Sequence, residues 1–372
     1  MTKDEVYLDC AASAPVTDEV LNFLHLQYAK KLGNSSSIHR AGVQANLELE
    51  KSRQTISDLV RCQADEIYFT SGATESNNLA LKGIFLNQIQ SNQELIISGF
   101  EHSSVQQVAL SLAKQGVVVK KAPLDSQGLI LLDDFEKLIT NRTKMVSIVH
   151  ANSEIGVIQN LAAIGQICRK KNIIFHSDGA QAFCKTPVNV QEMNLDIYSF
   201  SGHKIHAPKG VGAIYIRHGV QVHPQIEGGG HESGLRSGTV PVETISSFAF
   251  ATTLYTADRI LKLKQLQVFL IEQLKANFSN VRIHGSLDSR ICSQLNFAIP
   301  GLNGKAILKK LDAEGIRISV GSACQSGKKS ASTTLKAIGL SDDQAFEALR
   351  VSWGLESSQQ DLQYLIQALK NK

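Results

Sequence analysis

Short apolar runs alternate with amphipathic stretches along the middle of the chain. The runs have the length and the β-branched and aromatic content of buried strands, and they are residues 66–69, 94–98, 117–119, 145–149, 173–177, 195–200 and 212–216. The stretches between them have apolar residues at helical spacing, and they are residues 74–86, 103–114, 133–139 and 161–170. This βα alternation predicts an α/β fold with a mostly parallel, helix-flanked sheet.

A second βα set follows a long helical stretch at residues 242–278. Its predicted strands and helix are residues 281–283, 294–297, 305–314, 317–320 and 349–352. At 372 residues the chain exceeds the size of most single cores, so two domains are expected. We predict a large domain over residues 15–255 and a smaller α/β domain formed by residues 1–14 and 256–372.

The composition, 43% hydrophobic and 19% charged residues, is typical of a soluble enzyme. The net charge of +4 comes from scattered residues, which argues against a nucleic-acid partner. No apolar stretch is long enough to span a membrane, and the start does not resemble a secretory signal, so a cytoplasmic location is expected. The six cysteines lack CxxC spacing, which argues against a zinc site. The size of the chain and the absence of an export signal argue against disulfides.

Polar residues follow two of the strand-like runs. Asp178 ends the first, and Ser201-Gly202-His203-Lys204 follows the second. The carboxyl ends of strands are where open α/β sheets bind ligands. A carboxylate that pairs with a pyridine nitrogen and a lysine that forms an imine are what pyridoxal phosphate (PLP) requires of a protein. The alternatives are a helix N-cap for Asp178 and a solvated surface position for Lys204.

Two further segments can serve a phosphate group. Thr70-Ser71-Gly72-Ala73-Thr74 lies between a strand and a helix, where small residues let backbone N–H groups approach an anion. An ordinary N-cap is the alternative. Ser201 and His203 can point donors at the same phosphate. Residues 228–239 are dense in glycine and form either a flexible loop or a backbone that passes very close to another group.

Four other residues are candidates for chemistry. His102 can stack on an aromatic ring or move a proton, or it can be an exposed histidine at a helix start. Cys324 lies in a polar loop, residues 321–332, for which we expect mobility, and nearby Lys328 and Lys329 favour its thiolate. An incidental surface cysteine is the alternative. Arg350 can hold a carboxylate in a bidentate pair or form a surface ion pair, and Asn34 lies in a loop that can touch substrate.

Four segments, taken together, resemble the signatures of cysteine desulfurases, which are members of the class V aminotransferase family. They are residues 70–79, 199–204, 228–239 and 321–324, in the family's order, and the resemblance covers nearly the whole chain. It implies the type I PLP-dependent transferase fold. It also implies conversion of L-cysteine to L-alanine, with sulfur carried as a persulfide on Cys324 to an acceptor protein for iron–sulfur assembly or thiolation.

The resemblance also implies residue roles. Lys204 forms the imine with PLP, Asp178 pairs with the pyridine nitrogen, and His102 stacks on the ring. Arg350 and Asn34 hold the substrate carboxylate. Thr239 reaches the phosphate of the other subunit, which implies a homodimer. The remaining contacts, to the phosphate and to the PLP hydroxyl, are implied for Ala73, Thr74, Ser201, His203 and Gln181.

The chain departs from the family pattern at Ser153, where a second asparagine normally meets the PLP hydroxyl. Either that contact is weaker or the neighbouring Asn152 compensates. Three other activities remain open from the sequence: a selenocysteine lyase, a true aminotransferase, which would not need Cys324, and a non-catalytic sulfur-carrier or scaffold subunit. The presence of Lys204, Asp178 and Cys324 together argues against the last.

Overall fold

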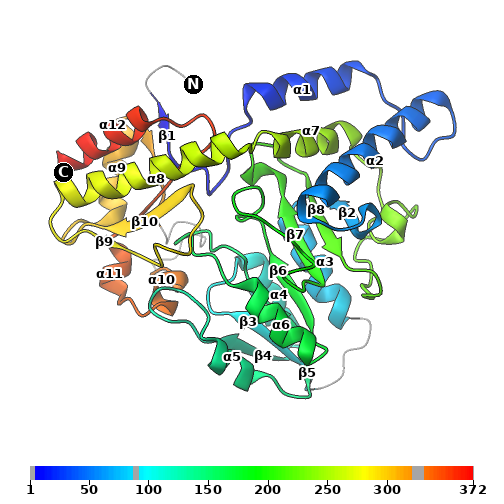
Figure 1. Cartoon of the computed structure of the whole chain (residues 1–372), viewed down its shortest axis with the longest axis horizontal. Coiled ribbons are helices and arrows are strands. Elements are labelled where there is room, and N and C mark those ends of the chain that lie inside the picture. Colours follow the sequence, from blue (N-terminus) through cyan, green and yellow to red (C-terminus); the bar gives the residue numbers. More distant parts are fainter. Residues whose placement is uncertain (1–4, 87–91, 321–330, 372) are drawn as a thin grey trace.

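The computed structural model of the chain describes residues 5–86, 92–320 and 331–371. A seven-stranded sheet forms the centre of the larger part (Figure 1). Its strands, in spatial order, are β2 (Ile67–Thr70), β8 (Gly212–Ile216), β7 (Ile197–Ser201), β6 (Ile174–Asp178), β5 (Thr143–Ser147), β3 (Glu94–Ser98) and β4 (Val118–Ala122). All neighbours are parallel except β8, which runs antiparallel to both β7 and β2. The predicted mostly parallel sheet is confirmed.

Both faces of the sheet are buried. Successive residues of β3 point to opposite faces, so Ile96 contributes to one hydrophobic core while Leu95 and Ile97 contribute to the other. This explains why the central strands read as continuous apolar runs. The helices of this part of the chain are α1 (Asp18–Ala29), α2 (Arg40–Val60), α3 (Ala73–Phe85), α4 (Ser103–Ala113), α5 (Leu132–Leu138), α6 (Leu161–Lys170) and α7 (Val242–Thr253).

A smaller unit lies beside the large sheet, on the left in Figure 1. It contains a three-stranded antiparallel sheet in the order β12 (Ala348–Ser352), β10 (Gln294–Ala298), β9 (Arg282–Ile283). A separate parallel pair joins β1 (Val6–Tyr7), near the start of the chain, to β11 (Ile316–Arg317). Trp353 is fully buried in the core of this unit. Its helices are α8 (Ala257–Asn277), α9 (Gly304–Ala313), α10 (Thr333–Ala337), α11 (Asp342–Phe346) and α12 (Gln359–Lys370).

The long helix predicted over residues 242–278 is two helices, α7 and α8. The chain leaves helical geometry at Thr256, which has an extended backbone, and the Thr256 hydroxyl accepts a hydrogen bond from Arg259 N at 3.4 Å. An N-cap of this kind starts a new helix inside an otherwise continuous apolar pattern. The pattern also did not predict α1 or α2. Of the predicted strand 317–320, only Arg317 lies in a strand, β11.

Within the described ranges no helix combines the length and apolarity needed to cross a bilayer. The carboxyl ends of β3, β5, β6 and β7 lie at one edge of the large sheet, because these strands are parallel and adjacent. Glu101, Val149, Asp178 and Lys204 all come at or shortly after these strand ends. Topology therefore gathers the candidate residues at this edge.

Candidate active site

Lys204 lies in the single helical turn Gly202–Lys204 that follows β7. Its Nζ donates hydrogen bonds to the carbonyls of Ala11 and Ala12, both at 2.7 Å. These carbonyls belong to the segment after β1, which Ser352 holds through a 2.8 Å bond from Ala11 N to its hydroxyl. The amine is half-buried and fixed by backbone groups, so it is a positioned group rather than a solvated surface lysine.

Asp178 ends β6 and is buried. Its Oδ1 accepts from Ala180 N at 2.9 Å, and its Oδ2 accepts from Asn77 Nδ2 at 2.7 Å. Asn77 comes from the inner face of α3 and also donates to the hydroxyl of Ser104 at 2.9 Å. These two donors fix the orientation of the carboxylate.

Gln181 shares an acceptor with Lys204. Its Nε2 donates to the Ala11 carbonyl at 2.8 Å, while its Oε1 accepts from Lys185 Nζ at 3.4 Å. His203 packs on the same N-terminal segment, with its Nδ1 3.2 Å from the hydroxyl of Ser13. Burial, aided by the charges of Lys204 and Lys209, lowers the pKa of His203 to about 4. The imidazole is therefore neutral at pH 7.

The N-terminus of α3 carries no side-chain cap. Gly72 stands at the N-cap position with φ of +146°, a conformation that glycine adopts readily, and Ala73 and Thr74 form the first turn. A Cβ on Gly212 would lie 2.6 Å from the Gly72 Cα, so β8 can approach this turn only with glycine there. Uncapped N–H groups at a helix start fit a phosphate. Ser201, at the end of β7, is buried.

The glycine-dense segment is anchored at two points. Glu232 pairs with Arg53 of α2 at 2.8 Å and accepts from Phe69 N at 2.6 Å, and both side chains are buried. Arg236 pairs with Glu75 of α3 at 2.9 Å. These two ion pairs tie the segment to α2 and α3, and Thr239 is exposed.

His102 begins α4. Its Nδ1 accepts from Ser104 N at 3.1 Å and lies 2.8 Å from the Ser104 hydroxyl, and the residue is exposed. The structure thus shows the helix-start role that the sequence left open. His102 and Thr74 line one shallow pocket, which places the ring near the uncapped end of α3.

Arg350 lies in β12 and is buried, so it is not part of a surface ion pair. Its Nη2 pairs with Asp9 at 2.7 Å, its Nη1 donates to the Ser153 carbonyl at 3.0 Å, and its Nε is buried without a partner. The guanidinium therefore keeps a donor for a carboxylate. Asn34 is exposed, and its Oδ1 accepts from Ser36 N at 3.0 Å.

Asn152 organises the turn that follows β5. Its Oδ1 accepts from the backbone N–H groups of Glu154 and Ile155, and its Nδ2 donates to the Phe100 carbonyl at 3.1 Å. The half-buried Ser153 presents its carbonyl to Arg350. Cys324, with the rest of residues 321–330, lies outside the described residues.

Comparisons with known proteins show to which family this chain belongs. A model of the family "Aminotransferase class-V" matches residues 6–365. A "Cysteine desulfurase IscS" of Dictyoglomus turgidum is 36% identical over 371 residues, which cover 99% of this chain and 94% of that protein. The chain belongs to the cysteine desulfurases of this family. The resemblance stated from the four sequence segments is confirmed.

Solved structures of cysteine desulfurase relatives agree with the fold. A "NIFS-LIKE PROTEIN" superposes with a TM-score of 0.91 at 32% identity, over 99% of this chain and 98% of that one. A structure titled "SspA in complex with cysteine" superposes with a TM-score of 0.84 at 32% identity, over 95% and 99% of the two chains. The predicted type I fold is confirmed, and the family implies PLP as cofactor. The fixed lysine, the buried aspartate and the uncapped helix start fit that group.

Sequence reasoning missed several residues of this cysteine desulfurase site. Asn77 lies within the segment 70–79, but the sequence pattern assigned it no role. Its spacing from Ala73 places it one turn along the same helix. Asp9 belongs to no pattern that predicts a partner for Arg350. Glu101 directly precedes His102 and is fully buried, and only the structure shows what surrounds it.

Glu101 gives a pH prediction. Burial, with a smaller effect from the charge of Asp178, raises the pKa of this carboxyl from 4.5 to about 8. Its Oε1 accepts from the Ser98 hydroxyl at 2.5 Å and from Val149 N at 2.7 Å. Between pH 4.5 and 8 the folded state holds a proton that the unfolded state has lost. This group therefore lowers the free energy of unfolding by up to about 1.4 kcal/mol per pH unit in that window.

Glu101→Gln keeps the acceptor oxygen and removes the titration. We expect the variant to gain stability over the wild type progressively from pH 5 to pH 8, as measured by urea unfolding at each pH. Glu272→Gln, at an exposed position on α8, is the control and should follow the wild-type curve. Parallel curves for wild type and Glu101→Gln would contradict the assignment.

Proposed function

We propose that this protein is a PLP-dependent cysteine desulfurase. It converts L-cysteine to L-alanine and passes the sulfur, as a persulfide on Cys324, to an acceptor protein for iron–sulfur assembly or thiolation. The observation that carries the proposal is the convergence of Lys204 and Asp178 at the ends of adjacent strands β7 and β6, in a chain that belongs to the cysteine desulfurases.

The side chains suit distinct tasks. When bound, PLP supplies an electron sink for the bonds at the substrate Cα and Cβ. Lys204 holds the cofactor and, once released, moves the proton at Cα. Asp178, oriented by Asn77 and Ala180, keeps the pyridine nitrogen protonated. The phosphate group is assigned to the first turn of α3, through Ala73 and Thr74, together with Ser201 and His203.

Gln181 and His102 complete the cofactor assignment. Gln181 lies beside Lys204 on the Ala11 carbonyl and is assigned to the ring hydroxyl. His102, at the start of α4, is assigned to the face of the ring. The Asn152 side chain forms hydrogen bonds with backbone groups. We therefore assign it the role of fixing the conformation of the loop that carries Ser153.

The sulfur step needs a thiolate nucleophile and a substrate held on PLP, which would stabilise the electron pair left on the substrate. The Cys324 thiolate attacks the substrate sulfur, an S–S bond forms, and the Cβ–S bond breaks. The electron pair of the broken bond stays on the substrate carbon skeleton, which takes up a proton and leaves as alanine. Arg350 and Asn34 are assigned to the substrate carboxylate. The unpartnered Nε of Arg350 supports that assignment.

The product balance tests the function. The purified protein, loaded with PLP, is given L-cysteine and a reductant, and alanine and sulfide are measured together. Equal amounts are expected. Pyruvate with ammonia, or no sulfide, would overturn the proposal. Activity on L-selenocysteine with none on L-cysteine would identify a selenocysteine lyase, and formation of a keto acid without sulfide would identify an aminotransferase.

A homodimer with shared sites belongs to the same proposal. Thr239 is exposed beyond the anchored glycine-dense segment, which leaves it free to meet the phosphate of a second copy. Exposed apolar side chains gather on and between α1 and α2, and they are Leu21, Leu26, Tyr28, Ile38, Val43 and Leu47. Large apolar side chains left in water in such numbers indicate an interaction surface. Sedimentation of the holoprotein should give twice the chain mass.

Removal of Arg350 should affect binding of substrate more than its conversion. We expect Arg350→Ala to raise KM for L-cysteine by about 10- to 100-fold, because the charged hydrogen bonds to the carboxylate are lost. Steady-state kinetics of sulfide release measure this. Arg282→Ala, at the half-exposed edge strand β9, is the control. An unchanged KM in Arg350→Ala would contradict the assignment.

A further inference from the structure

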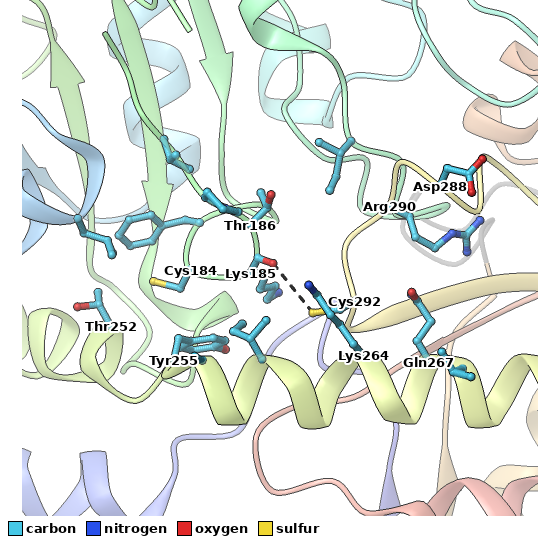
Figure 2. A pocket seen from close by; sticks show the side chains of 18 of the residues that line it. Cys184, Lys185, Thr186, Thr252, Tyr255, Lys264, Gln267, Asp288, Arg290 and Cys292 are labelled. Carbon is cyan, nitrogen blue, oxygen red and sulfur yellow. Dashed lines mark hydrogen bonds between the residues drawn. The ribbon is translucent and has the colours of Figure 1, made fainter. Parts of the chain in front are cut away.

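Figure 2 shows a second pocket, of about 640 Å³. It is formed by residues 183–188 beyond β6, the first turns of α8, and residues 287–292 of the smaller unit. None of Lys204, Asp178, His102 and Arg350 lines it. Its volume is that of ordinary small-molecule sites. Much of its wall is apolar and includes Leu59, Ile158, Phe183, Val188, Ile260 and Val268.

Lys185 brings a buried charge to this pocket. It is only 7% exposed, and burial lowers the pKa of its amine to about 8. In the described part of the chain no carboxylate pairs with Lys185, and its Nζ has a single long contact, 3.4 Å to Gln181 Oε1. Its titratable neighbours are the thiols of Cys10, Cys184 and Cys292. Burial raises the pKa of all three thiols, so they remain neutral and do not offset the charge.

Two more cations line the pocket. Lys264 extends from α8 into the same pocket and lies near Cys292 (Figure 2). Arg290 lies toward the other end, where its Nε and Nη2 donate to the carbonyls of residues 284–286 and its Nη1 is buried without a partner. Asp288 is the one carboxylate among the lining residues, and within the described ranges none of these four groups forms an ion pair. The pocket is therefore positively charged.

A buried cation without a counter-charge is unfavourable, and an anion that enters from solvent removes that cost. We propose that this pocket binds a small organic anion, a carboxylate on a short apolar chain. The carboxylate lies between Lys185 and Lys264, and the chain packs on the apolar wall. An α-amino acid is a poorer ligand, because its ammonium group would meet the two lysines. The proposed site adjoins the reaction site through the Lys185–Gln181 contact, but Lys204, Asp178, His102 and Arg350 do not line it, and the proposal does not depend on the desulfurase activity.

The test uses the PLP-loaded protein and calorimetric titration with hexanoate, acetate and hexan-1-ol at constant ionic strength. Hexanoate should bind about tenfold or more tightly than either comparison compound, because only hexanoate has both the charge and the chain. Lys264→Ala and Lys185→Met should each weaken hexanoate binding by about tenfold or more. Lys275→Ala, an exposed lysine near the far end of α8, is the matched control and should bind like the wild type.

Arg350→Ala separates this pocket from the substrate site, which also attracts carboxylates. It should leave the hexanoate affinity unchanged. Since Lys264 is exposed, its replacement leaves the fold intact and keeps the test valid even if Lys185→Met fails to fold. Three results would overturn the proposal: no binding of hexanoate at millimolar concentration, wild-type affinity in Lys264→Ala, or loss of binding in Arg350→Ala alone.

Discussion

Lys204→Ala should abolish the reaction, with sulfide release from L-cysteine lowered by on the order of 10³-fold or more. The amine is placed by two 2.7 Å bonds to the carbonyls of Ala11 and Ala12, and the substitution removes it from that position. The variant should bind PLP only reversibly. Borohydride reduction followed by intact-mass measurement should add the cofactor mass to the wild type and not to the variant.

Lys209→Ala is the control for Lys204. Lys209 is exposed and follows the same strand, so its replacement changes the local charge but leaves the reaction intact. Circular dichroism should show that both variants are folded. Sulfide release by Lys204→Ala at the wild-type rate would overturn the assignment of the catalytic amine.

Cys324→Ala should separate binding of the substrate from transfer of its sulfur. L-cysteine should still change the absorption spectrum of the bound cofactor, because Lys204, Asp178 and Arg350 are untouched. Sulfide and alanine should fall by about 100-fold or more, because burial raises the pKa of the other five thiols and keeps them from supplying a thiolate.

Cys62→Ala is the matched control for Cys324. Cys62 is half-buried, and burial raises the pKa of its thiol to about 12, so it contributes no thiolate. Persulfide on the protein, detected by mass spectrometry after a single turnover, should be present in Cys62→Ala and absent in Cys324→Ala. Wild-type sulfide release from Cys324→Ala would show that the mechanism is wrong.

Local pattern was enough to find most of the sheet. The runs before Asp178 and Lys204 became β6 and β7, because a buried strand of a parallel sheet is apolar on both faces and needs no information from distant residues. The pattern failed where apolar content did not change at a boundary. Thr256 interrupts a continuous helical pattern with one hydroxyl, and the exposed apolar residues of α1 and α2 blur the contrast between buried and exposed faces.

The sequence by itself determined the family, and it predicted PLP chemistry with Lys204 and Asp178 as the two residues on which that chemistry would depend. Each of these predictions depends on a short segment, because residue type and spacing near one strand end are sufficient to make it. Only the tertiary structure decided which groups orient these two residues and Arg350. Asn77 contacts Asp178 at a sequence separation of 101 residues, Ala11 contacts Lys204 at 193, and Asp9 contacts Arg350 at 341. Such contacts arise from the packing of whole elements. Local periodicity therefore does not predict which distant residues will be in contact.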